Sequence, residues 1–270
     1  MGERIAAAFG RAADDGRAAL MPYMMGGFPD RGAADAIASA YADSGADMIE
    51  LGVPFSDPLA DGPVIHEAAS RALDAGATLE GVLETCALVS GRVPVVTMVY
   101  ANTVLSAGPE RYASMLADAG GAGAIVPDLP REEGAEIRAA LTEAKLDLIP
   151  LVAPTTPDER RRRICAEAQG FVYVVSLAGV TGERRELPPH LRELVEAVKE
   201  EAAVPAAVGF GIGTPEQAAE VGEIADGVII GSRLVREAAE AGGADAAAEA
   251  VSAFLRDTRA ALDGTAINRE

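Results

Sequence analysis

Residues 205–232 read PAAVGFGIGTPEQAAEVGEIADGVIIGS, and this stretch decides the fold class. It contains two short apolar runs, Pro205–Phe210 and Gly227–Ile230, with the composition of buried strands. A segment of helical composition, Thr214–Val221, lies between them, and each apolar run leads directly into glycine. A strand, a helix and a second strand in this order predict a βαβ unit with parallel strands.

The same unit recurs along the chain of 270 residues. Six further apolar runs have strand length: Ala19–Met25, Asp47–Leu51, Pro94–Tyr100, Gly123–Pro127, Asp147–Val152 and Phe171–Ser176. Segments of helical length lie between most of the strands: Arg31–Ser44, Pro109–Ala119, Arg131–Lys145, Pro157–Gln169 and Leu187–Ala202. The apolar runs are nearly continuous, which is typical of parallel strands that are buried on both faces.

Eight strand–helix units in a chain of this size predict an α/β fold, the (β/α)8 barrel, with residues 1–270 as a single domain. Two helices are additional to the eight units: one precedes the first strand, and one covers Ala244–Leu262. A doubly wound open sheet is the alternative fold. It would require a reversal of strand order, which a sequence does not reveal.

Composition narrows the class of function. The net charge is −19, from 23 basic and 42 acidic residues, and such a surface repels nucleic-acid phosphates and anionic lipid. The basic run Arg160–Arg163 is therefore interpreted as the solvated face of a helix. No apolar stretch approaches the ~20 residues that a membrane span needs, and the N-terminus carries acids in place of a signal sequence. Cys86 and Cys165 lack disulfide or metal spacing, which favours the reducing cytoplasm.

Glycine-rich segments follow the last three predicted strands. In a (β/α)8 barrel the loops after the strands carry the chemistry, and those after strands seven and eight often bind phosphate. Glycine lets the main chain approach an anion closely, and free amides at a helix N-terminus bind it. We therefore expect a phosphate group on Gly182, Gly211, Gly231 and Ser232. The alternative is that these glycines only form tight turns.

The densest candidate for chemistry is residues 49–63, IELGVPFSDPLADGP. Because side chains alternate along a strand, Glu50 points into the barrel if Ile49 and Leu51 pack on the helices. Burial raises the pKa of a carboxyl group toward neutrality, which suits proton transfer. Asp61, in the loop that follows, can reach the same ligand. The alternatives are a structural role for Glu50, bonded to main-chain amides, and a turn-capping role for Asp61.

Other catalytic classes find little support in the sequence. Lys145 and Lys199 do not end a strand, where a Schiff-base lysine would lie. His66 and His190 lie in separate segments without a second metal ligand nearby, and no GxSxG element or reactive-cysteine signature is present. Acid–base chemistry by carboxylates, without metal or cofactor, is the class that remains.

At this point the motifs resemble those of a known family. PYMMGGFPD, IELGVPFSDPLADGP, MVYAN, VPDLP, SLAGVTG, VGFGI and ADGVIIGS occur in the order of the tryptophan synthase alpha chains, across residues 20–235. The resemblance implies a (β/α)8 barrel that cleaves indole-3-glycerol phosphate by a retro-aldol step into indole and glyceraldehyde 3-phosphate. It also implies an α2β2 complex, in which a beta chain that carries pyridoxal phosphate receives the indole.

The resemblance assigns roles to individual residues. Glu50 would move protons to indole C3 and from the glycerol hydroxyl, and Asp61 would bind the indole N–H. The indole pocket would consist of Tyr23, Tyr100, Pro127, Tyr173 and Val175. Thr181 would lie on a lid after strand six, and the phosphate site would coincide with the glycines and serine named above. The loop Pro54–Asp61 would face the beta chain.

Two positions depart mildly from the family pattern, where phenylalanine is frequent in place of Tyr23, and threonine or alanine in place of Met25. The segment Glu183–Pro189 is also unusually rich in arginine and proline. Three hypotheses remain open at this stage: a lyase that works in an α2β2 complex, a free-standing lyase of the same chemistry, and a non-catalytic subunit that activates the beta chain.

Overall fold

A single parallel sheet organises the described part of the chain. The computed structural model describes residues 2–175, 190–209 and 211–266. Among these residues, nine strands pair in the order β5-β4-β3-β2-β1-β9-β8-β7-β6. Their bounds are β1 (Ala19–Met25), β2 (Ile49–Gly52), β3 (Val95–Met98), β4 (Gly123–Ile125), β5 (Asp147–Ile149), β6 (Leu151–Val152), β7 (Val172–Val175), β8 (Ala206–Gly209) and β9 (Gly227–Ile230).

This order is that of a (β/α)8 barrel. The strands follow one another around the sheet in chain order without a reversal, so the doubly wound alternative is wrong. The two ends of the sheet, β5 and β6, are separated only by Pro150. They correspond to the single strand that the sequence predicts at Asp147–Val152. Proline has no N–H to donate, yet its carbonyl still accepts a bond from the Tyr173 N–H, at 2.9 Å.

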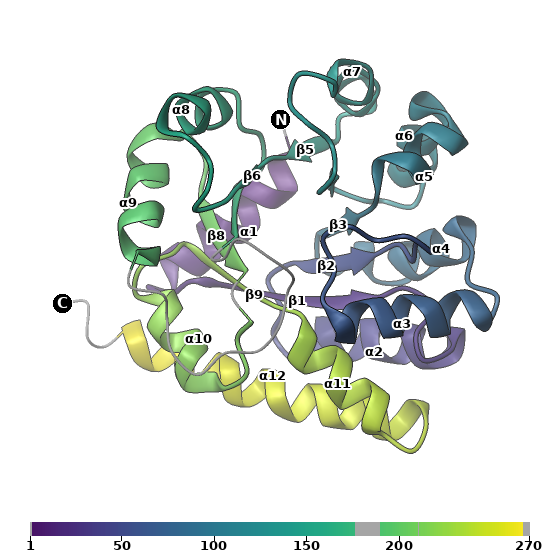
Figure 1. The fold of residues 1–270 in the computed structure, drawn as a ribbon. Helices are drawn as coiled ribbons and strands as arrows, with labels where there is room; N and C mark the ends of the chain where they lie inside the picture. Colours follow the sequence, from purple (N-terminus) through teal and green to yellow (C-terminus); the bar gives the residue numbers. More distant parts are fainter. Residues whose placement is uncertain (1, 176–189, 210, 267–270) are drawn as a thin grey trace.

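Helices surround the strands, as Figure 1 shows. Those described are α1 (Glu3–Asp14), α2 (Arg31–Asp43), α3 (Pro63–Asp74), α4 (Leu79–Ser90), α5 (Ala101–Ala107), α6 (Pro109–Asp118), α7 (Ala135–Glu143), α8 (Asp158–Ala166), α9 (Leu191–Glu201), α10 (Pro215–Gly222), α11 (Ser232–Glu240) and α12 (Ala244–Ala266). Side chains of Asp30, Thr78 and Thr214 cap three helix starts. None of the described helices has both the length and the apolar composition for crossing a membrane.

Two helices, α7 and α12, have bounds that differ from those of the predicted segments. The segment predicted at Arg131–Lys145 becomes helical only at Ala135, after turns that end at Gly134. The long C-terminal helix continues to Ala266, and it lies against α2, α10 and α11 (Figure 1).

Two apolar clusters fill the molecule. The larger lies between the strands and the surrounding helices, and includes Ile49 and Leu51. The smaller fills the barrel and includes Met48, which directly precedes β2 and faces the opposite side from Ile49. One side of α1 contributes Ile5 and Phe9 to this inner cluster. Because alternate residues of a strand face opposite sides, Glu50 shares the inner face with Met48.

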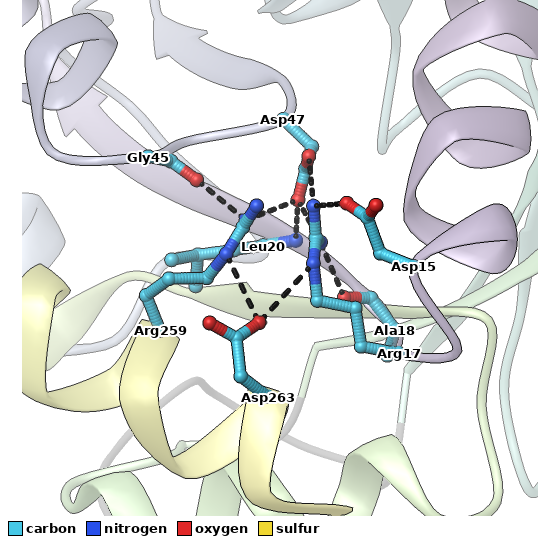
Figure 2. A network of polar contacts seen from close by, with 8 residues as sticks. All are labelled: Asp15, Arg17, Ala18, Leu20, Gly45, Asp47, Arg259 and Asp263. Atoms are coloured by element: carbon cyan, nitrogen blue, oxygen red, sulfur yellow. Dashed lines mark hydrogen bonds and ion pairs between the residues drawn. The ribbon is translucent and has the colours of Figure 1, made fainter. Parts of the chain in front are cut away.

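A buried polar network lies at the amino ends of β1 and β2, and Figure 2 shows it. The Asp47 carboxylate accepts hydrogen bonds from Arg17 at 2.7 and 3.0 Å, from Arg259 at 3.0 Å and from the Leu20 N–H at 2.8 Å. Asp263 of α12 lies 3.4 Å from Arg17 Nε. The network therefore joins the C-terminal helix to the start of the barrel.

Candidate active site

Glu50 lies inside the barrel on β2, two residues before the carboxyl end of that strand. It pairs in register with Tyr23 of β1, and only 1% of its surface is exposed. Its Oε2 atom is buried and has no hydrogen-bond partner among the described residues. Burial, and secondarily the charge of Asp61, raise the pKa of Glu50 to about 8. This arrangement does not match a structural acid bonded to main-chain amides, and it suits a group that gives and takes a proton near neutral pH.

Asp61 lies in the loop between β2 and α3, close enough to Glu50 for the two charges to interact. The N-cap residue of α3 is Gly62, and no side-chain cap hydrogen bond is present at the described start of this helix. Burial raises the pKa of Asp61, and a hydrogen bond from the Tyr100 hydroxyl and the charge of His66 partly oppose that rise. Two carboxyl groups in different surroundings can divide proton transfer and charge stabilisation between them.

Three tyrosines surround the carboxyl groups. Tyr23 comes from β1, Tyr173 from β7, and Tyr100 from the segment after β3. Burial raises the pKa values of Tyr23 and Tyr173 well above the ordinary one, and the charge of Glu50 adds to both rises. Tyr23 and Tyr173 thus lie near the same carboxyl group.

Two glycines leave the space that these rings occupy. A Cβ atom on Gly52 would lie 2.2 Å from the Tyr23 hydroxyl, and a Cβ atom on Gly209 would lie 2.3 Å from the Tyr173 hydroxyl. The Tyr23 hydroxyl bonds weakly to the Met25 sulfur, at 4.0 Å. The two positions that depart from the family pattern therefore contact each other.

Three apolar residues of the inner face were missed by the sequence analysis. Met98 and Leu151 are only partly buried and pack on the inner cluster, and Ile125, in register with Met98, is a member of it. Leu151 pairs in register with Tyr173. The alternation that located Glu50 would have found them, since Val96 and Met98, or Ile149 and Leu151, repeat every second residue.

The structure places the remaining predicted pocket residues, Val175 and Pro127, in different surroundings. Val175 ends β7, lies in register with Gly209 and is half-buried on the same strand face as Tyr173. Pro127, two residues after β4, lines a cavity of about 180 Å³ with Leu151, beside α7 and α8. No described contact brings Pro127 to the three tyrosines. Thr181 lies outside the described residues.

One of the predicted phosphate residues, Gly231, lies beside Tyr23. Gly231 is the N-cap of α11, and Ser232, 6% exposed, is the first residue of that helix. A Cβ atom on Gly231 would lie 3.7 Å from the Tyr23 ring. Gly211 precedes α10 with a φ of 40°, a conformation that favours glycine. Gly182 lies outside the described residues.

These positions form a chemically coherent site. The first amides of a helix have no partner within the helix, and its dipole favours an anion there. The N-terminus of α11, which follows β9, therefore offers main-chain donors near Tyr23 of β1, and β2, which carries Glu50, pairs with β1 on its opposite edge. A ligand with a flat apolar body and an anionic end would span this arrangement.

Comparisons with known proteins agree with this geometry. Residues 9–263 match the family model described as the tryptophan synthase alpha chain. The tryptophan synthase alpha chain of Roseiflexus castenholzii is 50% identical over 235 residues, which are 86% of this chain and 90% of that protein. That of a Synechococcus species is 45% identical over 262 residues, or 96% of this chain and 97% of that protein.

Solved structures give the same result. The Mycobacterium tuberculosis tryptophan synthase structure superposes with a TM-score of 0.90 and 38% identity, covering 97% of this chain and 99% of the matched chain. The tryptophan synthase subunit alpha of Legionella pneumophila gives 0.88 and 36%, with 97% and 98% covered. The chain belongs to the tryptophan synthase alpha chain family.

Proposed function

We propose that Glu50 performs the acid–base steps of this family's reaction and that Asp61 stabilises the indole nitrogen during them. The chain is a carbon–carbon lyase of tryptophan biosynthesis, which cleaves indole-3-glycerol phosphate. The observation that carries the assignment of Glu50 is its buried Oε2 atom on β2, which has no hydrogen-bond partner among the described residues and lies within the electrostatic reach of Asp61.

The proton steps follow from the position of Glu50. Protonated Glu50 gives its proton to C3 of the indole ring, which turns the ring into a positively charged indolenine. The resulting carboxylate then takes the proton of the glycerol hydroxyl as the C3–C1′ bond breaks. The bond electrons return to the ring, and the products are indole and the aldehyde. A pKa of about 8 leaves both forms of Glu50 accessible at neutral pH, and each turnover regenerates the acid.

Asp61 and the glycines bind the two ends of the substrate. An ionised Asp61 accepts a hydrogen bond from the indole N–H, which strengthens as that nitrogen becomes positive. Main-chain amides at Gly211, Gly231 and Ser232 hold the phosphate, with α11 directed toward it. Tyr23, Met98, Leu151 and Tyr173 supply apolar walls for the ring. For Thr181 and Gly182, the lid and phosphate roles stay predictions.

A partner is expected at the carboxyl end of the barrel. Two large apolar side chains are exposed there, Leu59 at 82% in the β2–α3 loop and Leu105 at 54% on α5, and neighbouring strands carry both elements. Exposed apolar groups at one end favour a protein contact. The partner is the tryptophan synthase beta chain, in an α2β2 complex. A cytoplasmic location, predicted from the cysteines, belongs to the same proposal.

Substitution of the two carboxyl groups tests their assignment. Glu50→Gln should lower turnover by about 10²–10⁴-fold, because the amide cannot exchange the proton, while affinity for inorganic phosphate survives. Asp61→Asn should lose most activity as well. The measurement is indole release from indole-3-glycerol phosphate, with Glu136→Gln, on the exposed face of α7, as the matched control. A near wild-type rate in Glu50→Gln would show that the role is wrong.

The same assay separates the three hypotheses about the working form. Strong stimulation of indole release by an added beta chain supports the α2β2 lyase. Full activity of the isolated chain supports a free-standing lyase. If the wild-type chain releases no indole under either condition, and yet stimulates the beta chain, it is an activating subunit.

A further inference from the structure

Tyr100 makes three separate contacts with the loop that carries Asp61. The N–H of Ala60 donates to its hydroxyl oxygen at 3.0 Å. The hydroxyl also lies close enough to the Asp61 carboxyl group to interact with it, and this interaction lowers the pKa of Asp61 and raises that of Tyr100. Its ring stacks on Phe55, with centroids 5.2 Å apart and an interplanar angle of 29°. One side chain thus contacts the loop near its beginning and at its end.

The chemistry of the hydroxyl sets the direction of these bonds. A phenol has one proton to donate and oxygen lone pairs to accept with. The Ala60 N–H can only donate, so it occupies a lone pair and leaves the proton of Tyr100 for the Asp61 carboxylate. A carboxylate that accepts a hydrogen bond is stabilised in its ionised form. Asp61 must be ionised to bind the indole N–H, so the bond supports the charge state that the proposed role needs.

Tyr100 is itself held firmly. It is 4% exposed, and it is the N-cap residue of α5. Its carbonyl accepts from the Thr103 N–H at 3.0 Å, and the following Ala101 N–H donates to Asp128 at 2.8 Å. The Asp128 bond joins this segment to the loop after β4. The loop with Asp61, in contrast, includes the largely exposed Leu59. Tyr100 is therefore the fixed element, and Asp61 is placed by it.

We propose that Tyr100 is a positioning residue, whose hydroxyl fixes the orientation and the ionised state of the Asp61 carboxylate for reaction with the indole nitrogen. The proposal rests on the proposed function, since it gives Asp61 a role in the reaction. It differs from the pocket prediction, in which Tyr100 is only a wall for the indole ring.

The other charged groups around Asp61 act in both directions. His66 of α3 lowers the pKa of Asp61, as Tyr100 does, and burial raises it. Asp61 also interacts electrostatically with Glu50 of β2 and Tyr23 of β1. Loss of the Tyr100 hydroxyl leaves, among the described groups, His66 to oppose the effect of burial, so the pKa of Asp61 should rise. The acid limb of the rate profile, where Asp61 becomes protonated, then moves to higher pH.

The test is Tyr100→Phe in the full chain, assembled as in the wild-type assay, with kcat and KM measured from pH 5 to 9.5. We expect kcat to fall about tenfold, the order of a lost hydrogen bond to a charged group, while KM changes less than about threefold. The matched control is Tyr112→Phe, which removes a buried hydroxyl bonded to Thr97 at 2.6 Å, between β3 and α6. The control should keep the wild-type pH profile, even if its thermal midpoint falls.

Asp61→Asn separates failure of this proposal from failure of the proposed function. In the Asp61→Asn background, Tyr100→Phe should have no further effect on kcat, because the acceptor of the bond has gone. If Asp61→Asn is inactive but Tyr100→Phe keeps the wild-type kcat and acid limb, the positioning role is overturned and the function stands. A rise in KM alone overturns it equally. An active Asp61→Asn overturns the role of Asp61 itself.

Discussion

The burial of Glu50 favours its proposed catalytic function but lowers the stability of the folded protein. A carboxyl group in the barrel, with one oxygen unpartnered among the described residues, loses its hydration on folding. The fold tolerates the group because it stays protonated over much of the physiological range, with a pKa of about 8. The same elevated pKa allows Glu50 to serve as both acid and base.

This conflict predicts that Glu50→Gln stabilises the protein, and more so at higher pH. Below pH 4.5 the carboxyl group is protonated in both states and has no effect. Between pH 4.5 and about 8 the unfolded chain releases the proton while the folded protein retains it, so stability falls as pH rises. The amide removes that fall, with an upper limit of about 5 kcal/mol. Urea unfolding of both proteins at pH 5 and pH 9 measures the difference. An equal effect at the two pH values would contradict the prediction.

At the scale of the element, α1 closes the amino-terminal end of the barrel, where its side chains pack on the inner cluster. Its Phe9 ring lies 5.7 Å from the Phe171 ring, centroid to centroid, inside the inner cluster. Arg4 donates to the carbonyl oxygens of Ser90, the last residue of α4, and of Gly120, which follows α6, and so anchors the helix. The sequence predicted this helix only as an addition to the eight units; the structure makes it part of the core.

Truncation of a buried α1 side chain should therefore lower the free energy of unfolding and leave the catalytic rate unchanged. Phe9→Ala should lower the free energy of unfolding by about 3–5 kcal/mol, as a buried phenylalanine does in other cores. The exposed residue Arg11 of the same helix is the matched control, and Arg11→Ala should change stability by less than about 0.5 kcal/mol. Per folded molecule, kcat should be unchanged, because α1 lies at the opposite end of the barrel from Asp61. A large loss of kcat in folded Phe9→Ala protein would refute this separation.

The elements show what the sequence can and cannot predict. Two-residue alternation placed Glu50 on the inner face, and glycine-rich loops indicated the start of α11, because both signals are local. The contact of Tyr100 with Asp61 was not predicted, since it depends on which loops become neighbours after the barrel forms. The break of the fifth strand at Pro150 was missed because its apolar composition continues through the proline.

At the scale of the whole molecule, contacts join elements near the start of the chain to elements near its end. We propose that the chain is a single domain, because β1 pairs with both β2 and β9 and so joins the first half of the barrel to the last. The polar network adds a second link: Arg259 of α12 donates to Asp47 across 212 residues of sequence. Sequence gives no signal for such a pair, since an arginine in a polar helix usually faces solvent.

The network should contribute to stability through Asp47 and hardly at all through Asp263. Asp47 is 9% exposed and accepts from two guanidinium groups, one of which, Arg17, is 4% exposed (Figure 2). Asp47→Asn would leave those cations facing a neutral amide, at a cost of about 3 kcal/mol in the free energy of unfolding.

Asp263→Asn is the matched control, because its side chain is 56% exposed, and it should cost about 0–1 kcal/mol. Urea unfolding with and without 0.5 M NaCl distinguishes a buried network from a surface one, since salt screens only exposed charges effectively. The loss in Asp47→Asn should persist at high salt. If the two variants lose equal stability, or if salt abolishes the effect of Asp47→Asn, the network is a surface feature, and the closure of the molecule depends on the apolar contacts of α12 instead.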